Sequence, residues 1–214
     1  MKCYDLTQII TEDMPVYPGT KPPSLSPVTT LDHDGFAETL MTLYSHTGTH
    51  MDAPAHMAVD GMTLDQLPVD RFIGPAVCID VRDVGQYITL EHLIPHQEAI
   101  AAADFVLLCT GWSKHWQDGT YYRGYPVLEE AAANWLAAHG LKGIGVDAIS
   151  VDPTDGNEYA NHGILFGACL FIIENLTNLE AIIGKKVLLT CLPVHYRHAD
   201  GAPVRAVALE GIND

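Results

Sequence analysis

The pattern of apolar and polar residues divides the chain near residue 73. Before that point, short apolar runs such as FAETLMTLYS alternate with Pro- and Gly-rich segments such as MPVYPGTKPP and DAPAH. Short runs bounded by turn residues predict β-strands and loops. After that point, apolar runs of strand length alternate with short helical patterns, which predicts an α/β layer.

Several segments of the second part predict individual elements. PAVCIDV, DFVLLCT, GIGVD, CLFIIEN, KVLLTCLPV and APVRAVAL predict strands, and TLEHLI predicts a short helix. PVLEEAAANWLAAHG predicts an amphipathic helix that stops at Gly140. Its apolar face comprises Leu128, Ala132, Trp135 and Leu136. Thr177 and Glu180 form the pattern of a capping box for one more short helix.

Length and composition describe one globular domain over residues 1–214. The chain has 48% hydrophobic and 18% charged residues, with no internal repeat or charged linker. A net charge of −16 excludes nucleic acid and anionic membranes as partners. Four of the five scattered cysteines lie in apolar runs, which predicts buried thiols in a reducing cytoplasm. Neither a signal peptide nor a membrane span is expected.

The segment HTGTHMDAPAH, residues 46–56, concentrates the candidate chemistry. His46, His50, Asp52 and His56 occupy even positions, so in an extended chain they would share one face. A flat strand would still hold His46 and His50 roughly 13 Å apart, too far for one zinc ion. The chain must therefore curl, and Gly48 permits this without steric cost. Imidazole and carboxylate ligands favour zinc, manganese or iron over calcium or magnesium.

Further ligands are expected from elsewhere in the chain. Glu174 ends the apolar run GACLFIIE, where an ionised side chain is costly unless it is paired or metal-bound. His162 begins the same segment. The alternatives are a carboxylate that turns outward and a solvated loop histidine. Asp52 could bridge two cations, which together can activate a water and polarise a carbonyl.

His56 lies beyond Pro54, offset from the other candidate ligands. It could act as a general acid/base or as a further ligand, and its position does not separate these roles. Tyr17, in the turn VYPG, could present its ring to a pocket or simply pack on the turn. His33, His195 and His198 receive no assigned role. The chain contains neither GxSxG nor a Gly-rich phosphate loop.

These segments resemble the cyclase-like metal-dependent hydrolase family, which includes the bacterial-type kynurenine formamidases. The resemblance begins at HTGTHMDAPAH and continues through GVDAISVDP, HGILFGACLFIIENLTNLE and LPVHYRHADGAPVRAVAL. It implies a swivelling β/β/α domain with a mixed sheet, short helices and a β-rich N-terminal part. It also implies a homodimer or homotetramer, with zinc or manganese, two ions per subunit, at the site.

The resemblance also implies a role for each site residue. One cation would bind to His46, His50 and Asp52, and a second to Asp52, His162 and Glu174. His56 would be the proton donor and acceptor, and Tyr17 would contact substrate. Kynurenine formamidases carry a tryptophan at the position of Tyr17 and commonly a phenylalanine at the position of Met57. Because of these two differences, the resemblance does not identify the substrate.

The sequence therefore predicts a metal-dependent amidohydrolase that cleaves a small amide, formamide or lactam with a metal-activated water. The alternatives are an isatin-type cyclic amide hydrolase, a lactone hydrolase or an elimination enzyme on the same site. A non-enzymatic metal- or ligand-binding protein is the third alternative, and it would leave His56 without a task.

Overall fold

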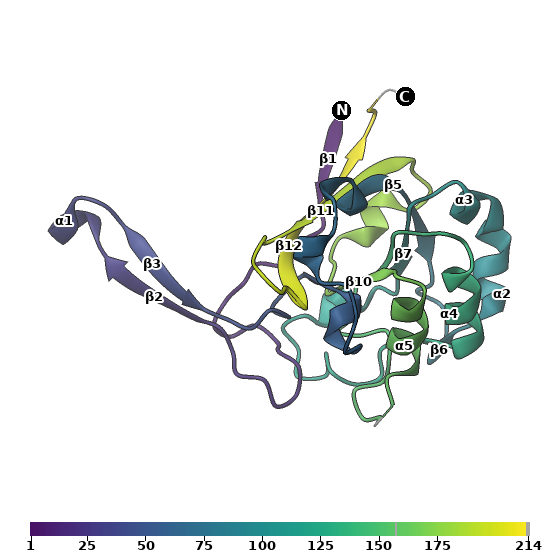
Figure 1. The fold of residues 1–214 in the computed structure, drawn as a ribbon, viewed down its shortest axis with the longest axis horizontal. Coiled ribbons are helices and arrows are strands. Elements are labelled where there is room, and N and C mark those ends of the chain that lie inside the picture. Colours follow the sequence, from purple (N-terminus) through teal and green to yellow (C-terminus); the bar gives the residue numbers. More distant parts are fainter. Residues whose placement is uncertain (157, 213–214) are drawn as a thin grey trace.

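The fold is built around one mixed eight-stranded sheet (Figure 1). The structure is a computed structural model that describes residues 1–156 and 158–212. The strands run in the order β1 (Lys2–Asp5), β12 (Gly201–Glu210), β11 (Val187–Pro193), β5 (Ile73–Asp80), β7 (Phe105–Cys109), β9 (Gly143–Val146), β10 (Phe171–Glu174) and β4 (His50–Asp52). β5, β7, β9 and β10 are parallel. β4 pairs antiparallel with both β10 and the beginning of β12, so the sheet closes on itself.

Two hydrophobic cores lie on the two faces of this sheet, as the alternation along β7 shows. Val106 and Leu108 belong to the core that contains Leu136 and Leu165 of the helical layer. Leu107, which points to the opposite face, belongs to the core that contains Phe171. Every residue of β7 is buried, which is expected for a central parallel strand with both faces covered.

Four α-helices gather on one side of the sheet (Figure 1). They are α2 (Leu90–Leu93), α3 (Gln97–Ala101), α4 (Glu130–Ala137) and α5 (Ala160–Gly167). A two-stranded parallel sheet of β6 (Tyr87–Ile88) and β8 (Val127–Leu128) completes this layer. The 3₁₀ turns are η1 (Pro54–His56), η2 (Leu64–Gln66), η3 (Val69–Phe72), η4 (Ile94–His96), η5 (Trp112–His115) and η6 (Leu179–Ile182).

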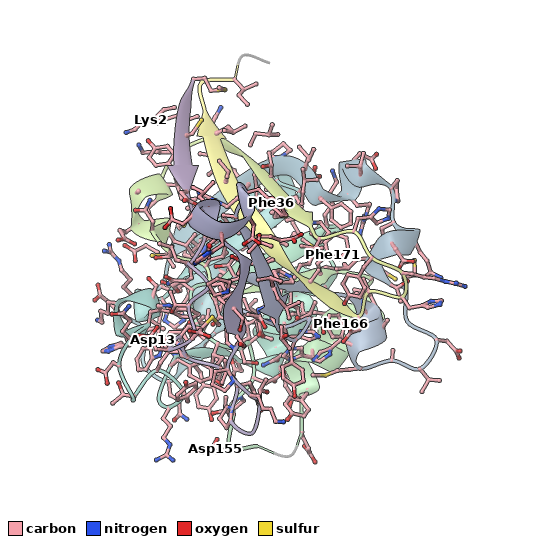
Figure 2. All side chains as sticks on the ribbon, turned by 90° about the vertical axis from the view of Figure 1, so that its left-hand side faces the viewer. Lys2, Asp13, Phe36, Asp155, Phe166 and Phe171 are labelled. Atoms are coloured by element: carbon pink, nitrogen blue, oxygen red, sulfur yellow. The ribbon has the colours of Figure 1, made fainter. Side chains whose placement is uncertain are left out.

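A hairpin arm projects away from the body of the molecule (Figure 1). It consists of β2 (Ser24–Thr29), the short helix α1 (Leu31–Asp34) at its tip, and β3 (Glu38–Thr42). Figure 2 views the molecule with this arm toward the reader. Its large apolar side chains are exposed, among them Phe36, Leu40 and Met41. A two-stranded hairpin of this kind is marginally stable in water unless another surface covers it.

The predicted mixed α/β fold with a β-rich N-terminal part is confirmed, and each predicted strand is present. The apolar face of the predicted helix is partly wrong, because Leu128 lies in β8 and Ala133 is buried in its place. The predicted capping box is also wrong. Asn178 precedes η6 in a left-handed conformation, while the backbone N–H of Thr177 donates to the carbonyl of Leu6.

All five cysteines are free, but they are not equally buried. Cys78, Cys109 and Cys191 are buried, as expected from their apolar runs. Cys169 is exposed, because it occupies a turn with φ 58° between α5 and β10. Among the described residues, no helix combines the length and apolar character needed to cross a membrane.

Candidate metal centre

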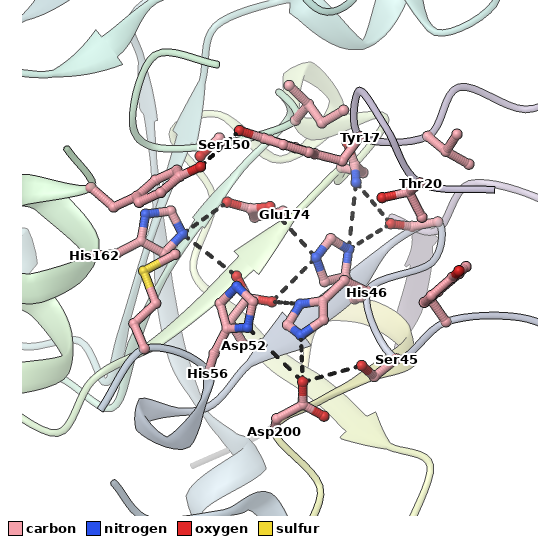
Figure 3. A pocket seen from close by; sticks show the side chains of 18 of the residues that line it. Tyr17, Thr20, Ser45, His46, Asp52, His56, Ser150, His162, Glu174 and Asp200 are labelled. Atoms are coloured by element: carbon pink, nitrogen blue, oxygen red, sulfur yellow. Dashed lines mark hydrogen bonds and ion pairs between the residues drawn. The ribbon is translucent and has the colours of Figure 1, made fainter. Parts of the chain in front are cut away.

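The predicted site residues line one pocket, a cavity of about 480 Å³ beside the ends of β4 and β10 (Figure 3). These lining residues include Tyr17, His46, His50, Asp52, His56, His162 and Glu174. They come from the segment between β1 and β2, from the loop before β4, from β4 itself, from η1, from α5 and from the end of β10. Segments far apart in the sequence therefore supply one concentrated group of imidazoles and carboxylates.

The loop before β4 curls where the sequence requires it. Gly48 adopts φ 65°, a left-handed conformation that a glycine tolerates without penalty. The Nδ1 of His50 bonds to the carbonyl oxygen of Gly48 at 2.8 Å. This curl brings the rings of His46 and His50 to 5.2 Å between centroids, far closer than a flat strand would allow.

Two groups of potential ligands share Asp52. His46, His50 and Asp52 offer ligand atoms that all lie within 4.8 Å of one another. The Oδ1 of Asp52 is 2.6 Å from Nδ1 of His46 and 3.2 Å from Nε2 of His50. Asp52, His162 and Glu174 form the second group under the same limit. The Nε2 of His162 is 3.7 Å from Oδ2 of Asp52 and 3.5 Å from Oε1 of Glu174.

The residues present fit a divalent cation. Oε1 of Glu174 is buried and has no hydrogen-bond donor among the described residues. A buried carboxylate oxygen without a partner is costly unless positive charge faces it. Imidazole nitrogens and carboxylate oxygens within a few ångströms are the donor set that zinc and manganese accept. The predicted alternatives for Glu174 and His162, an outward carboxylate and a solvated loop histidine, are wrong, because both side chains are buried in the pocket.

Without a cation, the carboxylates of the pocket favour the protonated, positively charged form of two of its histidines. Burial alone would lower the pKa of His46, but the Asp52 carboxylate and the hydrogen bonds to Asp52 and Asp200 raise it to about 9. Burial opposes protonation of His162 too, yet its hydrogen bond to Asp152 and the nearby carboxylates of Asp52 and Glu174 raise its pKa to about 12. The pKa of Asp52 is well below its usual range, because the neighbouring imidazoles outweigh the effect of burial.

His56 differs from the other histidines of the pocket. It lies at the end of η1, and its ring centroid is 4.0 Å from that of His46 and 6.4 Å from that of His162. Burial, reinforced by the two neighbouring imidazoles, lowers its pKa to about 4 even though Asp52 acts in the other direction. His56 also forms a group with His46 and Asp200 within 4.8 Å, so the ligand and acid/base alternatives both stay open.

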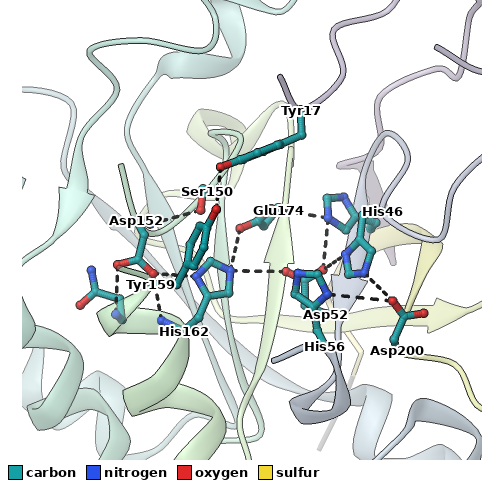
Figure 4. A network of polar contacts seen from close by, with 12 residues as sticks. Tyr17, His46, Asp52, His56, Ser150, Asp152, Tyr159, His162, Glu174 and Asp200 are labelled. Carbon is teal, nitrogen blue, oxygen red and sulfur yellow. Dashed lines mark hydrogen bonds and ion pairs between the residues drawn. The ribbon is translucent and has the colours of Figure 1, made fainter. Parts of the chain in front are cut away.

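Sequence reasoning missed several residues at this site. Asp200, Tyr44 and Tyr159 line the pocket, and Asp152 contacts His162 from behind (Figure 4). Of the histidines left without a role, His33 lies in α1 at the tip of the arm, and His195 and His198 do not line the pocket. The only signal for Asp152 and Asp200 was their position inside the segments GVDAISVDP and LPVHYRHADGAPVRAVAL. No local pattern indicated which loops meet.

Comparisons with known proteins show similar sequences and structures along nearly the whole chain. The Cyclase family model, described as "Putative cyclase", matches residues 4–153. The kynurenine formamidase of Bacillus mycoides (strain KBAB4) is 34% identical over 204 residues, which cover 95% of each chain. An isatin hydrolase bound to the product analogue thioisatinate has a TM-score of 0.85 at 26% identity, covering 97% of this chain and 91% of that one. A predicted metal-dependent hydrolase from Bacillus stearothermophilus has a TM-score of 0.81 at 30% identity, covering 97% of both chains.

Proposed function

The chain belongs to the cyclase family, and from this premise we propose that it is a metal-dependent amidohydrolase that cleaves a small amide, formamide or lactam. One observation carries the proposal. Two potential cation sites share the carboxylate of Asp52 in a single pocket, and the imidazole of His56 lies beside them. Such an arrangement suits hydrolysis of a carbonyl compound, because it combines sites for Lewis acids with a proton carrier.

We assign two divalent cations per subunit, zinc or manganese, to the two groups of ligands. His46, His50 and Asp52 would hold one cation, and Asp52, His162 and Glu174 the other. When bound, such cations lower the pKa of a water and polarise the carbonyl of a substrate. The protein's part is to hold imidazoles and carboxylates at fixed positions, and the paired strands β4 and β10 do so for His50, Asp52 and Glu174.

His56 is the residue to which we assign proton transfer. With a pKa of about 4 it is neutral near pH 7, so it can accept a proton. Its Nδ1 is 4.0 Å from Oδ2 of Asp200, beyond hydrogen-bond distance, so either ring nitrogen could take a proton from the attacking water. The same nitrogen would then return the proton to the departing amine nitrogen, whose expulsion as an unprotonated anion would be slow.

Aromatic side chains at the mouth of the pocket bear on the substrate. The hydroxyl oxygens of Tyr17 and Tyr159 lie 3.3 Å apart, so the two rings form one wall. Tyr44 and Met57 line the pocket as well. We infer that these residues accept a flat aryl group next to the scissile amide. An aryl formamide and a fused cyclic amide such as isatin both meet this description, and the similarity to an isatin hydrolase favours the second as an alternative substrate class.

A hydrolysis screen tests the proposed function. Protein stripped of metal by a chelator and then reloaded with zinc or manganese would be assayed with N-formylkynurenine, isatin and simple cyclic imides. We expect turnover of at least one compound, a product heavier by one water for a cyclic substrate, and loss of activity on stripping. Loss of mass without added water would indicate elimination. Full activity after stripping would refute the proposal, and inertness toward amides and lactones with metal bound would revive a non-catalytic binding role.

We further propose that residues 1–214 form one domain that assembles as a homodimer or homotetramer. The exposed apolar side chains of the hairpin arm support assembly, because they would be covered in an oligomer. Light scattering coupled to gel filtration measures the mass. Replacing Phe36 and Leu40 by serine should lower it if the arm mediates the contact, whereas serine at the exposed Ile94 of η4 should not. A location in the cytoplasm stays a prediction.

A further inference from the structure

Each of the three potential ligand histidines uses its two ring nitrogens differently, as Figure 4 shows for His46 and His162. One nitrogen faces the shared carboxylate of Asp52, and the other faces an oxygen outside the two ligand groups. For His50 that oxygen is the carbonyl of Gly48, at 2.8 Å from Nδ1. For His162 it is Oδ2 of Asp152, at 2.6 Å from Nδ1. For His46 it is Oδ2 of Asp200, at 3.1 Å from Nε2.

Asp152 is built into the protein interior. Its exposed fraction is 2%, and it lies in the loop between β9 and α5. Oδ1 accepts the backbone N–H of Asn161 at 3.0 Å, and Oδ2 accepts both the backbone N–H and the ring Nδ1–H of His162. These contacts tie the carboxylate to the first turn of α5 and to the imidazole that this turn carries.

Asp200 holds the opposite side of the pocket from a less buried position. Its Oδ2 accepts from the hydroxyl of Ser45 at 3.3 Å as well as from His46, and its Oδ1 accepts from the hydroxyl of Tyr196 at 3.1 Å. The same carboxylate is 4.0 Å from Nδ1 of His56. It therefore lies between a potential ligand and the proposed proton carrier.

We propose that Asp152 and Asp200 are positioning residues that fix which nitrogen of His162 and of His46 is free to bind a cation. With a cation between the imidazole and Asp52, only the ring nitrogen that faces Asp152 or Asp200 would carry a hydrogen, so the other nitrogen would offer its lone pair to the cation. Asp152 thereby presents Nε2 of His162, and Asp200 presents Nδ1 of His46. The inference rests on the proposed function, since it takes the two histidines as cation ligands.

The substitution Asp152→Asn tests the assignment for His162. An amide offers one oxygen and one NH₂ group, so it cannot accept all three N–H donors that Asp152 serves. If the NH₂ group faces Nδ1 of His162, the hydrogen moves to Nε2 and occupies the direction in which a cation would bind. We expect zinc affinity, measured by competition with a chromophoric chelator, to fall about 10–100-fold. Asp200→Asn should weaken zinc binding in the same way through His46.

Asp147→Asn is the matched control. Asp147 is also fully buried, and its carboxylate accepts the backbone N–H groups of Thr110 and Gly111 and the hydroxyl of Thr110. None of its described hydrogen bonds involves a histidine. Unchanged zinc affinity in Asp147→Asn beside a loss in Asp152→Asn supports the proposal. Wild-type affinity in Asp152→Asn, or equal losses in both variants, overturns it for Asp152, and wild-type affinity in Asp200→Asn overturns it for Asp200.

Nuclear magnetic resonance of the ring nitrogens gives a second test that needs no substitution. In the zinc-loaded wild-type protein, His162 should carry its hydrogen on Nδ1 and His46 on Nε2, and the opposite pattern would overturn the inference even if a variant failed to fold. Neither readout depends on hydrolysis. If the variants change zinc binding as expected but the protein cleaves no amide, the positioning roles stand and the proposed function fails. If the protein cleaves amides but Asp152→Asn binds zinc normally, the proposed function stands and the positioning role of Asp152 fails.

Discussion

Glu174 of β10 lies directly opposite His50 of β4 in the antiparallel pairing of the two strands, and Oε2 of Glu174 is 3.5 Å from Nε2 of His50. The next register pairs bring Met51 opposite Ile173 and Asp52 opposite Ile172. Side chains alternate along a strand, so His50 and Asp52 face the pocket while Met51 enters the core. Strand pairing thus fixes the spacing between the two groups of potential ligands before any cation binds.

Asp52 should be the residue on which both cations depend. Each of its oxygens faces one ligand group, so Asp52→Asn removes a charged donor from both at once. We expect the purified variant to contain little zinc or manganese by mass spectrometry and to lack turnover. Asp60→Asn, in the exposed segment after η1, is the control and should bind metal normally. A full complement of metal in Asp52→Asn would contradict the shared site.

His56→Ala should separate proton transfer from metal binding. If His56 moves protons without holding a cation, metal content stays at the wild-type level while kcat falls about 10²–10⁴-fold. If His56 is a ligand with His46 and Asp200, metal content and kcat fall together. His96→Ala, at an exposed position in η4, should change neither quantity. Steady-state kinetics and metal analysis on the same samples distinguish the two roles.

The alternation argument predicted side chains that do line one pocket, but it explains only part of their geometry. It holds for His50 and Asp52, which lie in β4. His46 reaches the pocket because the chain curls at Gly48, and His56 reaches it through the turn of η1. The alternation of side chains along a strand therefore does not explain the positions of these two rings. Sequence indicated that the chain must bend at Gly48, because ligand distances exclude a flat strand.

The other half of the site was harder to predict from local pattern. His162 lies in α5, whose sequence ANHGILFG contains two glycines and gives a weak helical signal, so no helix was predicted there. Its place beside Asp52 depends on how α5 packs on β10, a contact between distant segments. Asp152 and Asp200 were missed for the same reason, because loops that meet in space carry no shared pattern in the sequence. The strands were predictable, since burial on one or both faces leaves continuous apolar runs.

Gly201→Ala should displace His46 without unfolding the sheet. Gly201 begins β12, and a Cβ atom there would lie 2.5 Å from Cε1 of His46, closer than atoms tolerate. The ring cannot move freely, because Asp52 and Asp200 bond to its two nitrogens. We expect weaker zinc binding and lower kcat, both measured against Gly167→Ala at the end of α5.

Gly167 is a suitable control because a Cβ atom there meets nothing within 4 Å. Replacing a helical glycine by alanine is expected to leave the site intact and to add up to about 1 kcal/mol of stability. Equal zinc affinities for the two alanine variants would show that the pocket accommodates a methyl group beside His46. That result would contradict the tight approach of β12 to the ring.

Stability of the metal-stripped protein should fall as the pH rises from about 6.5 to 9. The folded state raises the pKa of His46 from its ordinary 6.5 to about 9, against the effect of burial, through Asp52 and Asp200. A group with a raised pKa contributes its full stabilisation below pH 6.5 and loses it as the pH rises through the folded value. His162, with a pKa of about 12, acts in the same direction across this window.

Bound zinc should oppose this loss of stability with rising pH. A cation must displace the protons that the imidazoles hold, so the affinity of the protein for zinc rises with pH. Urea unfolding at pH 6.5, 7.5 and 8.5, with a chelator or with excess zinc, measures both effects. We expect the gap between the zinc-loaded and stripped free energies of unfolding to widen at each step. In His46→Asn the stripped protein should lose less stability over the same range. A stripped wild-type protein whose stability stays level or rises toward pH 8.5 would show that His46 is not held as an imidazolium by the two carboxylates.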